Sequence, residues 1–219
     1  MRINLNLGQN IPMLTNFQKK LHLLAILSFS LWVASCKAKS SGNSSSDTIT
    51  ATTTAQNPAK IHWMTFEEAV AANASAPKKI FIDFYTSWCG WCKVMDNKTF
   101  DDTLIARLMQ EDFYCVKFNA EEKNPITFRD KTYKYIPNPN RTDGERGYHE
   151  LAAGILDGQM SYPTFVFMTS KFEIITPISG YIAKEDWEPI VSYIGKDYWL
   201  PEKNTSFEAY KESYKLLPR

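Results

Sequence analysis

The sequence predicts an α/β fold in which central strands have helices on both faces. Two observations support this prediction. Short apolar runs typical of strands alternate with segments of helical periodicity along residues 61–219. That stretch also has the length of one ordinary domain and can bury a sizeable core. A formal net charge of +1, with basic and acidic residues interspersed, gives no reason to expect a nucleic-acid partner.

Each element has a local signal. Thr65 and Glu68 form a capping box that opens a helix reaching Ala74. Apolar runs at 79–85 and 113–118 are expected to be strands. The other expected elements are a helix beginning at Cys89, an amphipathic turn (Leu104, Ile105, Leu108, Met109), a helical stripe (Tyr148, Leu151, Ala152, Ile155), a hairpin of strands at 164–168 and 172–177, and a closing helix (Trp187, Ile190, Val191, Ile194).

Two segments extend this pattern. An insertion spans about 120–160, where a small hairpin is expected at 126–135 around Asp130-Lys131, followed by a Pro- and Asn-rich loop at 136–140. The insertion is either part of a substrate platform or decoration without function. A C-terminal helical extension is expected from about residue 197. Its helix should follow a second capping box, with one aromatic side (Thr205, Ser206, Phe207, Glu208, Tyr210, Tyr214).

The run WCGWCK at 88–93 directly follows an apolar strand and places two cysteines at i and i+3. At a helix start these positions share one face, close enough for a disulfide. Free amides and the helix dipole favour a thiolate on Cys89, which is the expected nucleophile, with a pKa below the free value of roughly 8.5. Cys92, one turn inside, is the expected resolving thiol. Half of a zinc site and an inactive buried pair are the alternatives, but the sequence has no second CxxC and no His pair at ligand spacing.

Residues 82–93 resemble the active-site stretch of the thioredoxin superfamily, with Trp91 where thioredoxin has proline. YPT at 162–164 is similar to the cis-proline loop of that family, and SGY at 179–181 to its glycine turn before the last helix. The resemblance spans about 61–196 and is nearest to bacterial envelope proteins with a WCGWCK signature. It implies a thioredoxin-like fold with a central mixed sheet, and thiol–disulfide exchange without a cofactor or metal.

The resemblance also implies roles for two polar residues in apolar strands. The acid that matches Asp83 is buried beneath the disulfide in thioredoxins and helps to deprotonate the inner cysteine. Burial should raise the pKa of Asp83 toward a useful general-base value. Lys117 matches a lysine that pairs with this acid. Strand alternation alone leaves open an edge-facing Asp83 and a solvated Lys117.

Substrate-binding residues are expected around the cysteine pair. The resemblance implies a cis bond before Pro163, which would place Tyr162 beside the cysteines with its backbone free to pair with an extended substrate segment. Trp88 and Trp91, with Gly90 between them, are expected to offer an apolar platform. The alternative is that both tryptophans belong to the core.

Residues 1–36 are expected to be a lipoprotein signal peptide. A Lys-Lys pair precedes an apolar run ending in VASC, which resembles a bacterial lipobox and would lipidate Cys36. An ordinary signal peptide and an uncleaved anchor are the alternatives, and Met13 is the expected initiator. The tract 37–60, dominated by Ser, Thr, Ala and Asn, is expected to be a flexible tether.

Of the remaining residues with reactive or titratable side chains, Cys115 lies in an expected strand and should be an inert buried thiol, with a third redox role as the alternative. His62 and His149 are isolated and should be solvated.

The predicted function is that of a lipid-anchored, periplasm-facing thiol–disulfide oxidoreductase of the bacterial envelope, with the outer membrane preferred. We expect a monomeric reductase of disulfide-bearing proteins, supplied with electrons by a membrane donor. The alternatives are a non-enzymatic thioredoxin-like binding or chaperone module, and a dithiol oxidase that acts on thiol-bearing proteins.

Overall fold

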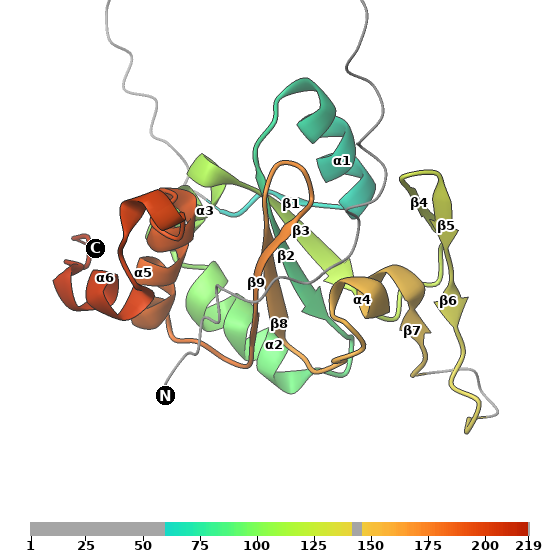
Figure 1. Cartoon of the computed structure of the whole chain (residues 1–219). Coiled ribbons are helices and arrows are strands. Elements are labelled where there is room, and N and C mark those ends of the chain that lie inside the picture. Colours follow the sequence, from blue (N-terminus) through green and yellow to red (C-terminus); the bar gives the residue numbers. More distant parts are fainter. Residues whose placement is uncertain (1–59, 142–145, 219) are drawn as a thin grey trace, which may run out of the picture. The chain divides into compact units, whose positions relative to one another are not determined.

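The computed structural model describes residues 60–141 and 146–218 (Figure 1). The expected signal peptide, Cys36 and the tether up to residue 59 lie outside the described residues and stay predictions. Among the helices of the described ranges, none combines the length and the hydropathy needed to cross a bilayer.

A five-stranded mixed sheet forms the centre of the domain, in the order β1-β3-β2-β8-β9 (Figure 1). The first three strands of that order run parallel, whereas β8 pairs antiparallel with β2 and with β9. The mixed sheet confirms the predicted fold class. The strands are β1 (Trp63–Met64), β2 (Lys79–Tyr85), β3 (Phe113–Asn119), β8 (Thr164–Met168) and β9 (Ile174–Ser179).

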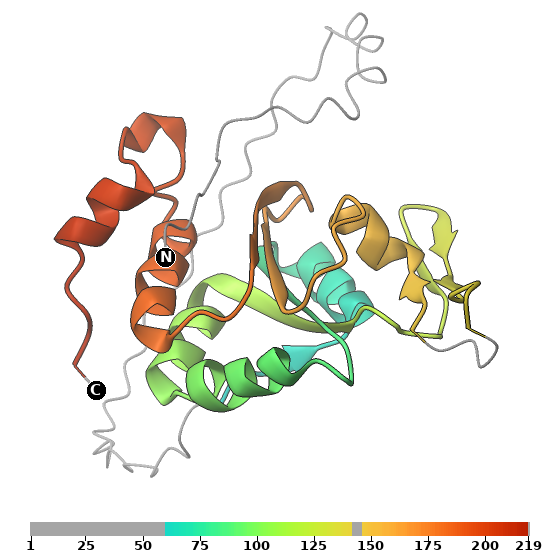
Figure 2. The ribbon, with the colours of Figure 1, turned by 90° about the horizontal axis from the view of Figure 1, so that it is seen from below.

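Helices cover both faces of the sheet, as predicted (Figure 2). On one face the core includes residues of α1 and α4; on the other it includes residues of α2, the π-helical turn η1, α3 and α5. The bounds are α1 (Phe66–Ser75), α2 (Gly90–Met95), η1 (Asp96–Phe100), α3 (Thr103–Asp112), α4 (Glu150–Ile155) and α5 (Lys184–Gly195).

Strand alternation decides which polar side chains face α2. In β2, Phe81 packs in the core on the α2 side, while Ile82 and Phe84 pack on the α1 side. Asp83 therefore points to the α2 face, because side chains alternate with a period of two. Lys117 is the register partner of Asp83 in the parallel pair of β2 and β3, so both polar side chains share that face.

Local capping signals explain where several helices begin. The capping box of Thr65 and Glu68 is present, as predicted, with both reciprocal hydrogen bonds formed. Asp102 caps α3 by accepting hydrogen bonds from two backbone amides, and it also binds the Lys184 ammonium. Cys89 is the N-cap of α2, so the helix begins within the CxxC motif.

The insertion contains two short hairpins rather than one. In the first, the turn lies at Arg129-Asp130, both left-handed at φ 50 and 62, one residue earlier than predicted. The second pairs β6 with β7 and replaces part of the loop expected at 136–140. The strands of the two hairpins are β4 (Ile126–Phe128), β5 (Lys131–Tyr133), β6 (Tyr135–Ile136) and β7 (Tyr148–His149).

Two predictions for the end of this insertion are wrong. Tyr148 belongs to β7 and is 40% exposed, so it is not part of the helical stripe of α4. His149 is fully buried rather than solvated: its ring packs against Phe118, and its Nδ1 accepts the Leu151 amide and caps α4. Burial lowers the pKa of His149. His62 is exposed, as predicted.

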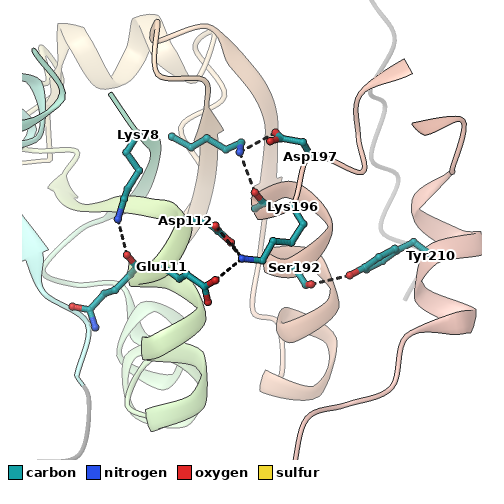
Figure 3. Close-up of polar contacts among 10 residues, drawn as sticks. Lys78, Glu111, Asp112, Ser192, Lys196, Asp197 and Tyr210 are labelled. Carbon is teal, nitrogen blue, oxygen red and sulfur yellow. Dashed lines mark hydrogen bonds and ion pairs between the residues drawn. The ribbon is translucent and has the colours of Figure 1, made fainter. Parts of the chain in front are cut away.

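The C-terminal extension packs on α5 through α6 (Phe207–Ser213), which follows a short 3-10 turn, η2 (Pro201–Lys203). The predicted capping box is wrong: Ser206 caps α6, whereas the Thr205 hydroxyl donates to the Lys203 carbonyl. Figure 3 shows the hydrogen bond between the Ser192 and Tyr210 hydroxyls, which links α5 to α6. The two oxygen atoms are 2.7 Å apart. It also shows Lys196 bound to two acids at the end of α3, Glu111 and Asp112.

Candidate redox site

The structure has a disulfide between Cys89 and Cys92, whose Cα atoms are 5.4 Å apart. Both residues are nearly buried, at 5% and 3% exposed. The Cys92 amide donates a hydrogen bond to Cys89 Sγ at 3.1 Å. Because an amide directed at sulfur stabilises negative charge there, this geometry favours Cys89 as the thiolate that attacks a substrate.

Asp83 lies in the core on the α2 face of the sheet, 1% exposed. Its Oδ2 accepts a hydrogen bond from Lys117 Nζ at 2.6 Å, while its Oδ1 has no hydrogen-bond partner in the described part of the chain. Burial raises the pKa of Asp83 to about 6 against the opposing charge of Lys117. A carboxyl group with this pKa can take up and release a proton near neutral pH, as a general base must.

Lys117 binds a second carboxylate, that of Asp96 in the turn η1. Sequence reasoning missed Asp96, although its position four residues after Cys92 on a helix could have indicated it. Burial disfavours the ammonium, but attraction to Asp83 and hydrogen bonds to both acids outweigh this and raise the pKa of Lys117. Its Nζ also lies 5.0 Å from the ring centre of Trp63 and 5.2 Å from that of Tyr85.

Trp91 and Trp88 are the most exposed large apolar side chains of the described ranges, at 62% and 50%. The alternative that they belong to the core is therefore wrong. Each contacts a tyrosine: the Trp88 ring is 6.0 Å from Tyr162, and the Trp91 ring is 5.7 Å from Tyr181. A Cβ at Gly90 would meet open space, so packing does not require glycine there. Two exposed aromatic pairs thus include the sequence neighbours of the disulfide cysteines.

The Tyr162–Pro163 peptide bond is cis, as the resemblance implied. Gly180, with φ of 92, donates its amide to the Pro163 carbonyl at 2.8 Å. This bond joins the proline loop to the end of β9, and the left-handed conformation explains glycine at the position. Burial, together with the nearby charge of Glu121, raises the pKa of Tyr162 to about 12.

Two residues of the insertion contact Trp88, and sequence reasoning singled out neither. The Trp88 indole donates to both carboxylate oxygens of Glu121, at 3.1 and 3.2 Å. The Arg146 guanidinium lies over the indole ring, 5.2 Å from its centre. No local sequence signal links these residues to the cysteine motif, because they lie 32 and 57 positions beyond Cys89.

Cys115 is a buried free thiol, as predicted. Burial raises its pKa to about 12, which keeps it protonated and unreactive at neutral pH. Within the described ranges, no group of three or more His, Cys, Asp or Glu side chains is placed to hold a metal ion.

Residues 44–138 match a protein family described as Thioredox_DsbH, protein of unknown function, DUF255. Human spermatogenesis-associated protein 20 is 35% identical over 80 residues, which cover 36% of this chain and 10% of that protein. The mouse protein of the same name is 34% identical over the same shares. The chain thus spans about a tenth of the length of the curated relatives that it matches.

Solved structures also align with the chain. One titled DsbH Oxidoreductase aligns with a TM-score of 0.40 and 19% identity, over 64% of this chain and 83% of that chain. A thioredoxin from Thermus thermophilus aligns with a TM-score of 0.45 and 17% identity, over 62% and 87%. The sheet order, the cis-proline and the cysteine pair at the start of α2 make the fold thioredoxin-like.

Proposed function

We propose that the protein is a thiol–disulfide oxidoreductase that reduces disulfides through Cys89 and Cys92. The observation that carries this proposal is the disulfide at the start of α2, with the Cys92 amide donating to Cys89 Sγ. The exposed aromatic pairs at Trp88 and Trp91 give an extended polypeptide a surface to bind, and the matched DsbH-like family is consistent with this chemistry.

The reaction begins with the reduced dithiol. The Cys89 thiolate attacks one sulfur of a substrate disulfide, so a mixed disulfide forms and the other substrate sulfur leaves as a thiolate. Cys92 then loses its proton and attacks Cys89 Sγ, which releases the second substrate thiolate and forms the Cys89–Cys92 disulfide. Two electrons pass to the substrate, and the dithiol is oxidised.

The buried acid supports the second step. Cys92 is buried, so its thiol needs a base within the protein to lose its proton. We propose Asp83 for this role, since its pKa of about 6 leaves it ionised at neutral pH and still able to accept a proton. Lys117 holds Asp83 Oδ2 and leaves Oδ1 without a partner among the described residues.

The expected cell location supports a reductase that needs a regenerating donor. Each turnover oxidises the dithiol to the disulfide, and an oxidising envelope offers no ready reductant to restore it. The proposal therefore includes a membrane-embedded electron donor. A lipid on Cys36 and the polar tract after it would hold the domain near such a donor. Retention of a Cys36→Ser variant at the membrane would contradict this anchoring.

The equilibrium redox potential tests the direction of electron flow. We would measure it in the full-length chain with Cys36→Ser, using the fluorescence of Trp88 and Trp91 in graded thiol buffers. A value near −270 mV, in the range of thioredoxin, supports a reductase. A value near −120 mV contradicts it and identifies an oxidant of thiol-bearing proteins.

A non-enzymatic binding module is the second candidate, because the exposed Trp88 and Trp91 could hold unfolded chains without exchange chemistry. The Cys89→Ser/Cys92→Ser double variant separates the two functions. Loss of function in cells supports the oxidoreductase, whereas full function of the double variant supports the binding module.

A further inference from the structure

Trp88 is the residue at which the insertion meets the redox site. It directly precedes Cys89 in sequence. Its indole N–H donates to Glu121, its ring lies under the Arg146 guanidinium, and its ring meets that of Tyr162 in a T-shaped arrangement. Despite these three contacts the residue stays 50% exposed. The ring is therefore held in one orientation with a free surface toward solvent.

Backbone hydrogen bonds place the insertion against the strand that leads to the CxxC motif. The Ala120 amide donates to the Tyr85 carbonyl at 2.8 Å, and the His149 amide donates to the Ala120 carbonyl at 2.7 Å. The Glu121 amide is held in turn by the Asn119 side chain at 3.1 Å. The start of the insertion is thus hydrogen-bonded to the ends of β2 and β3, which fixes the backbone position of Glu121.

Close packing also sets the position of Arg146. The next residue, Gly147, donates its amide to the Tyr135 hydroxyl at 2.9 Å. A Cβ at Gly147 would overlap the Ile136 carbonyl oxygen and the Tyr135 ring, so glycine is required for this approach. The hairpin of β6 and β7 therefore fixes the backbone beside Arg146.

Two exposed aromatic pairs lie at the CxxC motif. Trp88, directly before Cys89, pairs with Tyr162, and Trp91, between Cys89 and Cys92, pairs with Tyr181. A polypeptide segment bound at the disulfide would lie beside these aromatic rings. Large apolar or aromatic side chains of the segment would bury the most apolar surface against such rings and so gain the most binding free energy.

We propose that the insertion forms one wall of the substrate platform, with Glu121 and Arg146 as positioning residues that hold Trp88 for binding. The substrate class is an extended polypeptide segment with bulky apolar or aromatic side chains beside its disulfide-bonded cysteine. This inference rests on the proposed oxidoreductase function. The attacking step itself is unchanged: Cys89 sulfur bonds to the cysteine of the segment, and the other sulfur leaves as a thiolate with the electron pair of the broken bond.

A single-turnover assay with two peptides tests the proposal. Each peptide carries one cysteine as a mixed disulfide with 2-nitro-5-thiobenzoate, flanked in one peptide by Trp and in the other by Ser. The pre-reduced full-length chain with Cys36→Ser is mixed with excess peptide, and release of the coloured thiolate is followed. We expect the half-saturating concentration of the Trp peptide to rise about threefold to tenfold in Glu121→Ala and in Arg146→Ala, with little change in the limiting rate.

Conservative and matched variants control for general damage. Glu121→Gln keeps an oxygen that accepts the Trp88 N–H, so it should recover most of the loss. Glu111→Ala and Arg107→Ala remove the same residue types from exposed positions on α3, outside the insertion, and should behave like the parent chain. The half-saturating concentration of the Ser peptide should shift less than that of the Trp peptide in every variant.

The outcomes separate the inference from the function on which it rests. Equal shifts for both peptides, or no shift for either, overturn the role of the insertion while the exchange chemistry stands. If the parent chain releases no thiolate from either peptide, the proposed function fails, and the inference with it.

Discussion

Aromatic side chains gather in two regions of this domain, and the two clusters differ in exposure. Beside the disulfide, Trp88 and Trp91 keep half or more of their surface exposed. Where the C-terminal extension packs on α5, Phe207 of the extension and Tyr193 of α5 are buried, with ring centres 5.4 Å apart. The first cluster leaves apolar surface exposed to solvent, whereas the second buries its apolar surface within the chain.

Hydroxyl groups show the same difference. The Tyr193 hydroxyl donates to the Thr205 carbonyl at 2.8 Å, and that of Tyr210 is bonded to Ser192 (Figure 3). These bonds join α5 to the extension and give the polar groups in this contact hydrogen-bond partners. Near the disulfide, polar side chains instead orient a ring that stays open to solvent. Similar residue types thus stabilise the fold in one region and form an exposed aromatic surface in the other.

Removing the redox thiols should have the largest effect. Cys89→Ser should lower disulfide reduction by at least about a thousandfold, because it removes the proposed nucleophile and leaves Cys92 without a partner for the product disulfide. Cys92→Ser should accumulate a mixed disulfide with the substrate, detectable as a mass adduct. Cys115→Ser is the matched control and should keep the parent rate. Reduction by Cys89→Ser near that rate would contradict the proposed chemistry.

Truncating one aromatic residue in each cluster separates stability from binding. Phe207→Ala should cost about 3 kcal/mol of unfolding free energy, since the ring is 4% exposed. Trp91→Ala, at 62% exposed, should change it by no more than about 0.5 kcal/mol but weaken binding of an apolar peptide. Urea unfolding followed by circular dichroism measures the unfolding free energy of both variants. Equal losses of stability would mean that the clusters do not differ as proposed.

The pH dependence of stability tests Asp83. Its native pKa of about 6 exceeds the unfolded value, so the native state binds more protons between about pH 4 and 6, and stability falls as pH rises through that window. A difference of about two pKa units corresponds to about 3 kcal/mol. Asp83→Asn cannot ionise, so its stability relative to the parent should rise by up to that amount between pH 4 and pH 8. Parallel stability curves for the two oxidised proteins would refute the raised pKa.

The smallest expected effect is at the contact between α5 and the extension. Tyr210→Phe removes the hydrogen bond to Ser192 and should cost about 1 kcal/mol of unfolding free energy. The disulfide potential should not change, since the contact lies outside the redox site. The same unfolding and fluorescence measurements check both quantities, and a shifted potential would show that the two regions are coupled.

The elements with strong local signals were predictable from the sequence. The capping box at Thr65, the strand at 79–85 and the amphipathic turn at Leu104 depend on residues close together in the chain. The helix starting at Cys89 and the buried thiol of Cys115 belong to the same group. The errors lie where local signals compete, as at Thr205 and Ser206, or where tertiary packing buries an isolated residue such as His149.

By itself, the sequence determined the α/β pattern and the two cysteines able to form a disulfide, because period and spacing are local properties of the chain. Only the tertiary structure decided that Asp83 and Lys117 face α2, that Asp96 shares the lysine, and that Glu121 and Arg146 reach Trp88. Those contacts join residues 21 to 58 positions apart. Strand register and the packing of the insertion bring them together, and neither has a signature in a single local stretch of sequence.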